Sequence, residues 1–388
     1  MMHAKSAVFS IDEHKDRFAR ARAALKAAKL DACLMVAPEN VYYVGGYETW
    51  VGVNSPQFLI FTAKEDAPTL ILRNVDLALA RETTWVGDIR TYHLHTDSVP
   101  DLVTKVLKEK GLIRGRLGIE FQSYALPHGM ALTLKEALPG FDFADATDLF
   151  GDLRLVKSAA EIDMLRAAGK FAQIGLTAAK RTLKAGISEI ELAAEIEGAM
   201  RRAGSDYWAI PTELASGWRS AGGHAAPRPK AIEPGDLVHV EFAGVSNRYH
   251  ATALQTLGVG TPSKRATDLY DVALLSLKAG LAATKVGARV DAIEEASLEP
   301  LRKEGLEHAA MMRFGYGLGI AYPPIWLETL QISRGFDRVL EPGMVFVLHS
   351  CLELPDEELG VVQGGTYLLK EDGLEMLAGA GDIDLIRV

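Results

Sequence analysis

The stretch that decides the fold is SGWRSAGGHAAPRPKAIEPGDLVHVEFAGVSNRYHATALQTLGVG, residues 216–260. Within it, a Pro-Gly-Asp turn at 234–236 leads into an apolar, strand-like run at 237–242. The segment AGVSNR then turns the chain back into a second run at 249–257. Two such runs joined by a short turn predict a β-hairpin, and therefore an antiparallel sheet.

Three blocks further along the chain extend this pattern. RFGYGLGIAYPPIWLE (313–328) indicates a glycine-rich loop followed by Pro-Pro. VLEPGMVFVLHSCLEL (339–354) repeats the arrangement of a Pro-Gly turn before a strand, and GVVQGGTYLLKEDG (360–373) has the pattern of a closing strand. These blocks predict further strands of the same sheet.

Helical periodicity occurs between and before the strand-like blocks. Two of the helices begin with a capping box, in which a serine is followed three residues later by a glutamate. The boxes are Ser158 with Glu161 and Ser188 with Glu191, and the helical ranges are 158–186, 187–204, 269–284 and 289–304. Helices combined with antiparallel strands predict an α+β domain.

The first part of the chain has a different pattern, in which short apolar strands alternate with helices. Such alternation predicts an α/β domain. Helices are expected at 12–29 and 101–111, strands at 31–38, 58–61, 69–73 and 115–121, and a turn-rich stretch at 41–49. The boundary falls near 151–158, so the expected domains are residues 1–152 and 153–388.

Composition restricts the partners and the compartment. The net charge of −9 argues against nucleic acid or an anionic membrane surface, because both favour a basic protein face. The sequence has no apolar run of about 18 residues and no signal-peptide pattern at its start, so we expect no membrane span and a cytoplasmic protein. Its two cysteines, Cys33 and Cys351, predict no disulfide framework.

The four blocks, in this order, resemble the pita-bread superfamily of methionine aminopeptidase, prolidase, aminopeptidase P and creatinase. The linker LRLVKSAAEIDMLRAAGKFA (153–172) is similar to the one that precedes the catalytic domain in the prolidase and creatinase branch. The resemblance covers nearly the whole chain. It implies a creatinase-like N-terminal α/β domain, a C-terminal pita-bread catalytic domain and a homodimer.

Metal-dependent members of the superfamily bind a dinuclear centre through two aspartates, one histidine and two glutamates. The resemblance places these five ligands on Glu241, Thr252, Tyr316 and His349, and on or beside Gly364. Two divalent ions about 3.5–4 Å apart require several carboxylates, and this set supplies one. We therefore expect no dinuclear metal and no other cofactor, with a single weak ion at Glu241 and His349 left open.

The superfamily also contains metal-free enzymes, and their chemistry suggests roles for four residues. His224 of SAGGHAAP lies twelve residues before the aspartate of PGD, which matches the catalytic histidine of the creatinase and prolidase branch. VEFAG around Glu241, GYGLGIAYPPIW around Tyr316 and VFVLHS around His349 resemble ectoine hydrolase. The resemblance implies cleavage of a C–N bond in a small zwitterionic amidine. Glu241 would be nucleophile or base and His224 acid/base, with Tyr316 and His349 holding the substrate or the developing charge.

Three aromatic residues are candidates for substrate binding. Tyr47 and Trp50 lie in GYETW, and Trp326 follows the Pro-Pro of the second block. Together they would form an aromatic box that attracts a cation through cation–π contacts. Packing in a core or an interface is the alternative for each.

Other interpretations of these residues remain open at this point. Glu241 could form a buried ion pair with Arg248, and His349 could be a hydrogen-bonded core histidine. His224 could be a surface residue, and Tyr316 could only fill space. His239 and His250 are expected on the surface of the hairpin. The alternative functions are a creatinase-like amidinohydrolase, a metal-dependent Xaa-Pro peptidase and a non-catalytic binding module.

Overall fold

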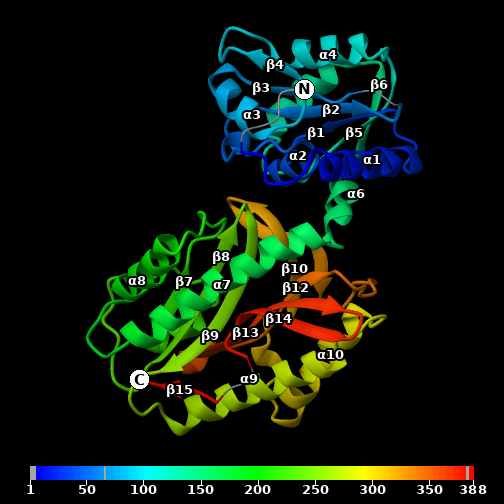
Figure 1. Cartoon of the computed structure of the whole chain (residues 1–388). Helices are drawn as coiled ribbons and strands as arrows, with labels where there is room; N and C mark the ends of the chain where they lie inside the picture. Colours follow the sequence, from blue (N-terminus) through cyan, green and yellow to red (C-terminus); the bar gives the residue numbers. More distant parts are fainter. Residues whose placement is uncertain (1–5, 65–66, 382–383) are drawn as a thin grey trace. The chain divides into compact units, whose positions relative to one another are not determined.

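The computed structural model describes residues 6–64, 67–381 and 384–388 (Figure 1). The chain divides into two compact units, Met1–Arg154 and Leu155–Val388. Among the described residues, no helix has both the length and the apolar character needed to cross a membrane. Cys33 and Cys351 are both free and buried.

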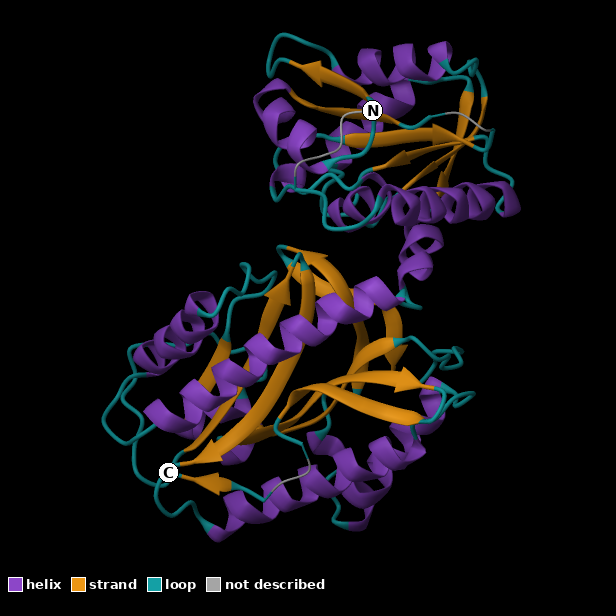
Figure 2. Cartoon of the chain, in the orientation of Figure 1, coloured by secondary structure: helices purple, strands orange, loops and turns teal. Residues whose placement is uncertain are grey.

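The N-terminal unit is a six-stranded sheet with helices on both faces (Figure 2). The strand order is β4-β3-β2-β1-β5-β6, and β1 pairs antiparallel to β2 but parallel to β5. Helices α4 and α5 cover one face, and α1 lies against the other through the contact of Phe18 with Phe61. The strands are β1 Ala32–Met35, β2 Phe58–Thr62, β3 Thr69–Arg73, β4 Asp88–Tyr92, β5 Gly115–Ile119 and β6 Phe141–Asp145; the helices are α1 Ile11–Ala27, α2 Pro38–Gly45, α3 Leu77–Thr83, α4 Val99–Glu109, α5 His128–Ala137 and α6 Thr147–Gly151.

The expected turn-rich stretch at 41–49 is wrong, because α2 continues to Gly45. The helix begins where the carboxylate of Glu120 accepts the backbone N–H groups of Val36 (2.6 Å) and Ala37 (2.7 Å). A carboxylate at a helix N-terminus satisfies orphan donors and complements the helix dipole. Glu120 is distant in sequence, so local sequence carries no sign of this cap.

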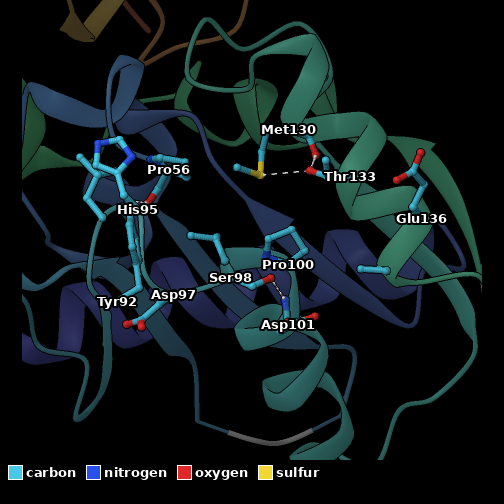
Figure 3. A pocket seen from close by; sticks show the side chains of 13 residues that line it. Pro56, Tyr92, His95, Asp97, Ser98, Pro100, Asp101, Met130, Thr133 and Glu136 are labelled. Atoms are coloured by element: carbon cyan, nitrogen blue, oxygen red, sulfur yellow. Dashed lines mark hydrogen bonds between the residues drawn. The ribbon is translucent and has the colours of Figure 1, made fainter.

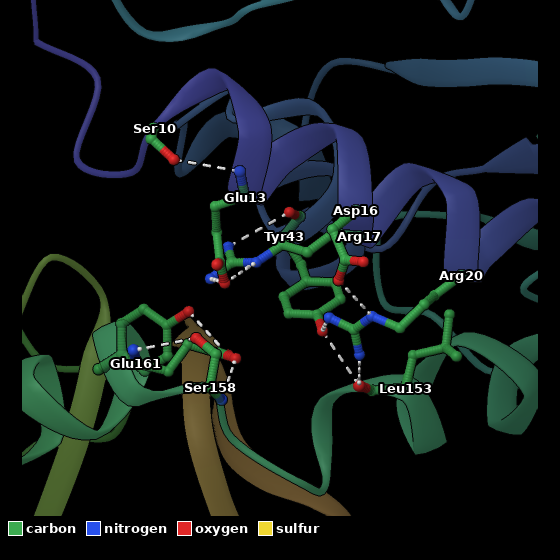
Figure 4. A network of polar contacts seen from close by, with 10 residues as sticks. Ser10, Glu13, Asp16, Arg17, Arg20, Tyr43, Leu153, Ser158 and Glu161 are labelled. Carbon is green, nitrogen blue, oxygen red and sulfur yellow. Dashed lines mark hydrogen bonds and ion pairs between the residues drawn. The ribbon is translucent and has the colours of Figure 1, made fainter.

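Helix α1 is fastened to α2 by a polar network (Figure 4). Arg20 donates to the hydroxyl of Tyr43 at 2.7 Å, and this hydroxyl donates to the carbonyl of Leu153 at 3.1 Å. The guanidinium of Arg17 lies 4.5 Å from the centre of the Tyr43 ring. These contacts fix the last residues of the N-terminal unit against its first helix.

The C-terminal unit is built on one large, mainly antiparallel sheet. Its strand order is β11-β10-β12-β13-β9-β8-β7, with β14 beside β13 and β15 beside β9. The strands are β7 Glu213–Ser216, β8 Leu237–Ser246, β9 Tyr249–Gly258, β10 Gly315–Tyr322, β11 Ile325–Ile332, β12 Val345–Leu354, β13 Leu359–Lys370, β14 Gly373–Gly379 and β15 Ile386–Arg387. The predicted hairpin is present as β8 and β9, paired without interruption from Leu237 to Ser246.

Two helix pairs cover one face of this sheet (Figures 1 and 2). In the first pair α7 packs on β8 and β9, and in the second α9 packs on β12 and β13. The helices are α7 Ala159–Thr182, α8 Glu189–Arg202, α9 Lys264–Ala283 and α10 Val290–Lys303. Both predicted capping boxes are present, and the one at Ser158 and Glu161 is visible in Figure 4. The α+β class is confirmed.

The expected glycine-rich loop at 313–328 is wrong, because this segment forms β10 and β11 with Pro323-Pro324 at the turn between them. Gly315 and Gly319 serve close approach within the sheet. A Cβ added at Gly315 would meet the carbonyl of Val347, and one at Gly319 would meet the carboxylate of Glu328. Glycine therefore allows these strands to lie against their neighbours instead of ending them.

Candidate active site

A cavity of about 470 Å³ opens on the sheet face of the C-terminal unit that the helices leave uncovered. Its lining comes from β7, β8, β10, β11 and β12 and from four of the segments that connect elements of this unit. Five of the seven residues proposed from sequence line it: His224, Glu241, Tyr316, Trp326 and His349. The structure therefore brings the four candidate catalytic residues together around one space.

The register of the sheet explains this convergence. Glu213 on β7 lies opposite Glu241 on β8, which lies opposite Leu254 on β9. Leu254 lies opposite Gly364 on β13, and Gly364 lies opposite His349 on β12. Residues directly opposite one another in a sheet point to the same face. This row of five residues therefore places two carboxyl groups and an imidazole along the cavity.

Glu241 is held by a tyrosine instead of an arginine. The hydroxyl of Tyr316 donates to Oε1 of Glu241 at 2.8 Å, and the indole N–H of Trp326 donates to the Tyr316 oxygen at 3.2 Å. The guanidinium of Arg248 donates hydrogen bonds to the carbonyl oxygens of Ala321 and Tyr207. The alternative that Arg248 forms an ion pair with Glu241 is therefore wrong. Burial raises the pKa of Glu241 to about 7, against the lowering effect of the Tyr316 hydrogen bond.

Tyr316 and His349 are both electrically neutral at pH 7. Burial, together with the nearby Glu241 carboxylate, raises the pKa of the Tyr316 phenol well above its ordinary value. Burial, together with the nearby charges of Arg313 and His224, lowers the pKa of His349 to about 4. The two rings are 5.9 Å apart, and Nδ1 of His349 is 3.2 Å from the Cys351 sulfur. Each side chain can therefore donate or accept a hydrogen bond without carrying charge.

His224 is exposed on a loop that is held in place by hydrogen bonds to Glu189. Glu189, the buried first residue of α8, accepts hydrogen bonds from the backbone and hydroxyl of Ser216 (2.9 and 2.8 Å) and from the backbone of Arg228 (2.9 Å). It also accepts from the guanidinium of Arg219. One buried carboxylate thus fastens both ends of the loop that carries His224 to the cavity.

Two charged residues that line the cavity, Glu213 and Arg313, were not predicted from the sequence. Glu213 begins the four-residue strand β7, and Arg313 lies at the cavity just before β10. Burial, together with the charge of Glu241, raises the pKa of Glu213 to about 8. The sequence signal for Glu213 was weak: one acidic residue at the start of a short apolar run.

Family models match the two units separately. Residues 17–156 match the N-terminal domain of creatinase and prolidase. Residues 163–372, more than half of the chain, match the metallopeptidase family M24. The chain belongs to family M24.

Relatives of this M24 chain include enzymes of different specificity. It is 28% identical over 390 residues to the ectoine hydrolase of Halomonas elongata, covering 95% of this chain and 96% of that protein. It is 27% identical over 349 residues to an Xaa-Pro dipeptidase of Pyrococcus furiosus, covering 90% and 93%. A solved prolidase from Thermococcus sibiricus has the same fold, with a TM-score of 0.89 at 22% identity over 98% of this chain and 100% of that one. The pita-bread resemblance is confirmed, and the chain is a member of a hydrolase family.

The five positions that the resemblance assigns to metal ligands do not fit a dinuclear centre in this M24 chain. Thr252 offers a neutral hydroxyl, which is buried and has no hydrogen-bond partner among the described residues. Gly364 has no side chain, and a Cβ there would lie 2.5 Å from the Cβ of His349. Across the described ranges, no group of three or more His, Cys, Asp or Glu side chains is placed to hold an ion. Since two divalent ions need several carboxylates, this donor set cannot hold them.

The three aromatic candidates do not share one environment. Trp326 lines the cavity, where it donates to Tyr316. Tyr47 and Trp50 belong to the N-terminal unit, where Tyr47 is 1% exposed and Trp50 is 62% exposed. Burial of Tyr47 is typical of a core residue, and exposure of Trp50 leaves its ring available. A role in substrate binding stays a prediction for both.

The expected surface position of His239 and His250 is wrong, because both are buried. Nε2 of His250 accepts the backbone N–H of Ala209 at 3.0 Å, while its Nδ1 donates to the carbonyl of Arg248 at 2.8 Å. Burial lowers the pKa of His250 to about 3 and that of His239 to about 4. His250 is therefore a neutral, structural residue that fixes the turn of the hairpin.

A second depression, of about 630 Å³, lies in the N-terminal unit beside β4, α4 and α5 (Figure 3). Its charged groups, which include His95, Asp97 and Glu136, are exposed to solvent. Asp97 already accepts the backbone N–H of His93 at 2.7 Å, and Ser98 caps α4. Reactive sites combine concavity with polar groups removed from water. The cavity of the C-terminal unit meets that condition, and this depression does not.

Proposed function

We propose that this chain is a metal-independent hydrolase that opens a C–N bond in a small zwitterionic amidine, with ectoine as the model substrate. The observation that carries the proposal is the half-buried Glu241 carboxyl, held by Tyr316 at a position where metal-dependent relatives have an aspartate ligand. An amidinium carbon is bonded to two nitrogens and is electrophilic without a Lewis acid. A carboxylate with a pKa of about 7 is suited to act as a base or nucleophile near neutral pH.

The charges around the cavity support a zwitterionic substrate. Glu213 and Glu241 form an acidic end. Among the described lining residues, Arg313 is the one lysine or arginine, and its guanidinium also donates to Gln331. Arg313 would therefore hold the carboxylate of the substrate, while the acidic end holds the amidinium. A compound with both groups matches a cavity lined by both signs of charge.

The reaction adds water across the amidine carbon and breaks one of its two C–N bonds. Glu241 either takes a proton from the attacking water or attacks the carbon itself, giving a tetrahedral centre; in the second case water then attacks the same carbon and the bond to Glu241 breaks, which restores the carboxylate. His224 gives a proton to the departing nitrogen, which leaves as an amine. The other nitrogen remains bonded to the carbon as a carboxamide. Neutral Tyr316 and His349 would stabilise the charge that develops at the tetrahedral centre by donating hydrogen bonds.

Incubation with a panel of cyclic amidines, guanidino acids and Xaa-Pro dipeptides, with and without added Mn²⁺, tests this proposal by mass spectrometry. We expect ring opening of an amidine without metal. Glu241→Gln should reduce turnover by about 10²- to 10⁴-fold, the usual contribution of a general base. Glu233→Gln, which changes an exposed carboxylate on the turn before β8, is the matched control. Full activity in the Glu241→Gln protein would sink the proposal.

The other candidate functions make different predictions in the same panel. The Xaa-Pro dipeptidase among the relatives favours peptide cleavage, and this function predicts turnover of the dipeptides only when Mn²⁺ is present. A creatinase-like enzyme would act on a guanidino acid, and a binding module would bind without turnover. The donor set of this chain is unsuitable for two metal ions, which argues against the metal-dependent Xaa-Pro peptidase.

We also propose that the protein acts as a cytoplasmic homodimer, as the resemblance to the prolidase and creatinase branch implies. The proposed substrate-binding role of Tyr47 and Trp50 would then be tested by substituting them in the dimer. Light scattering of the purified chain measures its mass in solution. A mass close to 42 kDa, that of one chain, contradicts the dimer.

A further inference from the structure

Glu213 and Glu241 form a pair of carboxyl groups at one end of the cavity. They lie directly opposite each other on β7 and β8, and both line the same space. Side chains in such positions have Cβ atoms about 4.5–5.5 Å apart. The two carboxyl groups therefore reach the same small volume.

The described residues leave this pair without a cationic partner. Neither carboxyl forms an ion pair with lysine, arginine or histidine among them, although each is largely removed from solvent. The groups around the pair are the phenol of Tyr316, the thiol of Cys351 and the imidazole of His349, all without charge at pH 7. The remaining titratable or charged side chains near the cavity are His224, His239, Arg313 and Glu353.

Two half-buried carboxylates at this separation repel each other, which favours the protonated form of at least one. The raised pKa of Glu213 reflects this repulsion together with burial. A cation placed between the carboxylates removes the repulsion and satisfies their oxygens. The free site is thus electrostatically incomplete, and a positively charged ligand completes it.

The two carboxyl groups differ in their hydrogen bonding, and this difference suggests different roles for them. Oε1 of Glu241 is occupied by the Tyr316 hydroxyl, which leaves Oε2 for the reacting carbon or for water. Glu213 has no such bond in the described structure and faces the same space from the next strand. One carboxyl is therefore arranged for chemistry, and its neighbour is available for binding.

We infer that Glu213 is the residue that selects a cationic substrate, by accepting an N–H of the amidinium and balancing its charge while Glu241 acts on the adjacent carbon. The inference rests on the proposed function only in taking the substrate cation to be an amidinium. A planar amidinium directs its N–H bonds outward in one plane, so a carboxylate beside it accepts one in a charge-assisted hydrogen bond. A neutral amide of the same shape offers an N–H but no charge.

Binding of acetamidinium, measured by calorimetry at pH 9, tests the inference without any turnover. Acetamide is the neutral comparison, since it has nearly the same size and shape. We expect the wild-type protein to bind acetamidinium in preference to acetamide. Glu213→Gln should weaken acetamidinium binding by about 10- to 100-fold, the loss expected for a hydrogen bond to a charged group. Glu213→Asp should retain part of the affinity, and Glu233→Gln all of it.

Two results would overturn the inference: wild-type protein that does not distinguish acetamidinium from acetamide, and a folded Glu213→Gln protein that binds acetamidinium as tightly as wild type. Thermal melting of each variant establishes that it is folded. The outcome is separate from that of the proposed function. If ectoine is not hydrolysed but Glu213→Gln loses acetamidinium binding, the selection of a cation stands. If Glu213→Gln hydrolyses ectoine with an unchanged KM, the hydrolase stands and the inference falls.

Discussion

Removing the hydroxyl of Tyr316 should shift the ionisation of Glu241. In Tyr316→Phe, the 2.8 Å hydrogen bond to Glu241 is lost while the ring remains. A hydrogen bond to a charged group contributes about 1.5–3 kcal/mol, which corresponds to about 1–2 pKa units. Because this bond lowers the pKa of Glu241, its removal should raise that pKa from about 7 to roughly 8–9.

The shift has a calculable effect on activity at pH 7. The ionised fraction of Glu241 falls from about one half to about 1–10%. If ionised Glu241 is the base, kcat/KM at pH 7 should fall by about 5- to 50-fold, and most of the loss should be recovered near pH 9. The acid limb of the pH–rate profile should move to higher pH by the same amount, about 1–2 pH units.

Infrared difference spectroscopy measures the ionisation directly and needs no substrate. The carboxyl band of Glu241 is identified by subtracting the spectrum of Glu241→Gln at each pH. Trp326→Phe is the matched comparison, because it removes the neutral N–H that bonds to Tyr316 instead of the bond to Glu241 itself, and its shift should be smaller. A Glu241 pKa that is unchanged in Tyr316→Phe, or a loss of activity that is equal at every pH, refutes this reasoning.

Three other expectations follow from the described contacts. The pKa values of Glu213 and Glu241 are raised from an ordinary 4.5 to about 8 and 7, so their contribution to stability is present below pH 4.5 and is lost as pH rises through 7 and 8. Urea denaturation should therefore show wild type losing stability relative to the Glu213→Gln/Glu241→Gln double variant between pH 4.5 and 9; parallel pH dependences contradict this. Lys157→Met should cost about 3–5 kcal/mol, because it leaves the carboxylate of Glu328 buried without its 2.6 Å partner. Adding Glu328→Gln should restore much of that loss, and a thermal melt unchanged by the single substitution speaks against it. Treatment with EDTA should leave amidine turnover unchanged, whereas stoichiometric bound metal with EDTA-sensitive activity would overturn the proposed chemistry.

Local sequence predicted the elements whose signals are local. The hairpin of β8 and β9 follows from a Pro-Gly turn, two apolar runs and a short turn between them, and the capping boxes at Ser158 and Ser188 mark the starts of α7 and α8. Cap residues and turn residues act over three or four positions, so the pattern contains them. The fold class and the grouping of His224, Glu241, Tyr316 and His349 were predicted through the resemblance of several such blocks.

What the sequence could not supply depends on contacts between distant strands. Glu213 becomes part of the site because β7 pairs with β8 in a register that places it opposite Glu241. The glycines at 315 and 319 indicated a loop, but they are required by neighbouring strands that lie close. His239 and His250 were expected at the surface because polar residues in a hairpin usually face water. Nearly all side chains on both faces of this hairpin are buried, so alternation carries no information there.

Gly364 determines whether this sheet can carry a carboxylate side chain beside His349. A side chain at this position is blocked, since its Cβ would lie 2.5 Å from the Cβ of His349 and 2.6 Å from the carbonyl oxygen of Leu348. Substituting Gly364 by glutamate would therefore destabilise the sheet, whatever residue stood at position 252. The residue at 349 and the spacing of β12 and β13 would have to change first. The order of substitutions is thus constrained by sheet packing, and no single substitution at this position can supply a metal-ligating carboxylate.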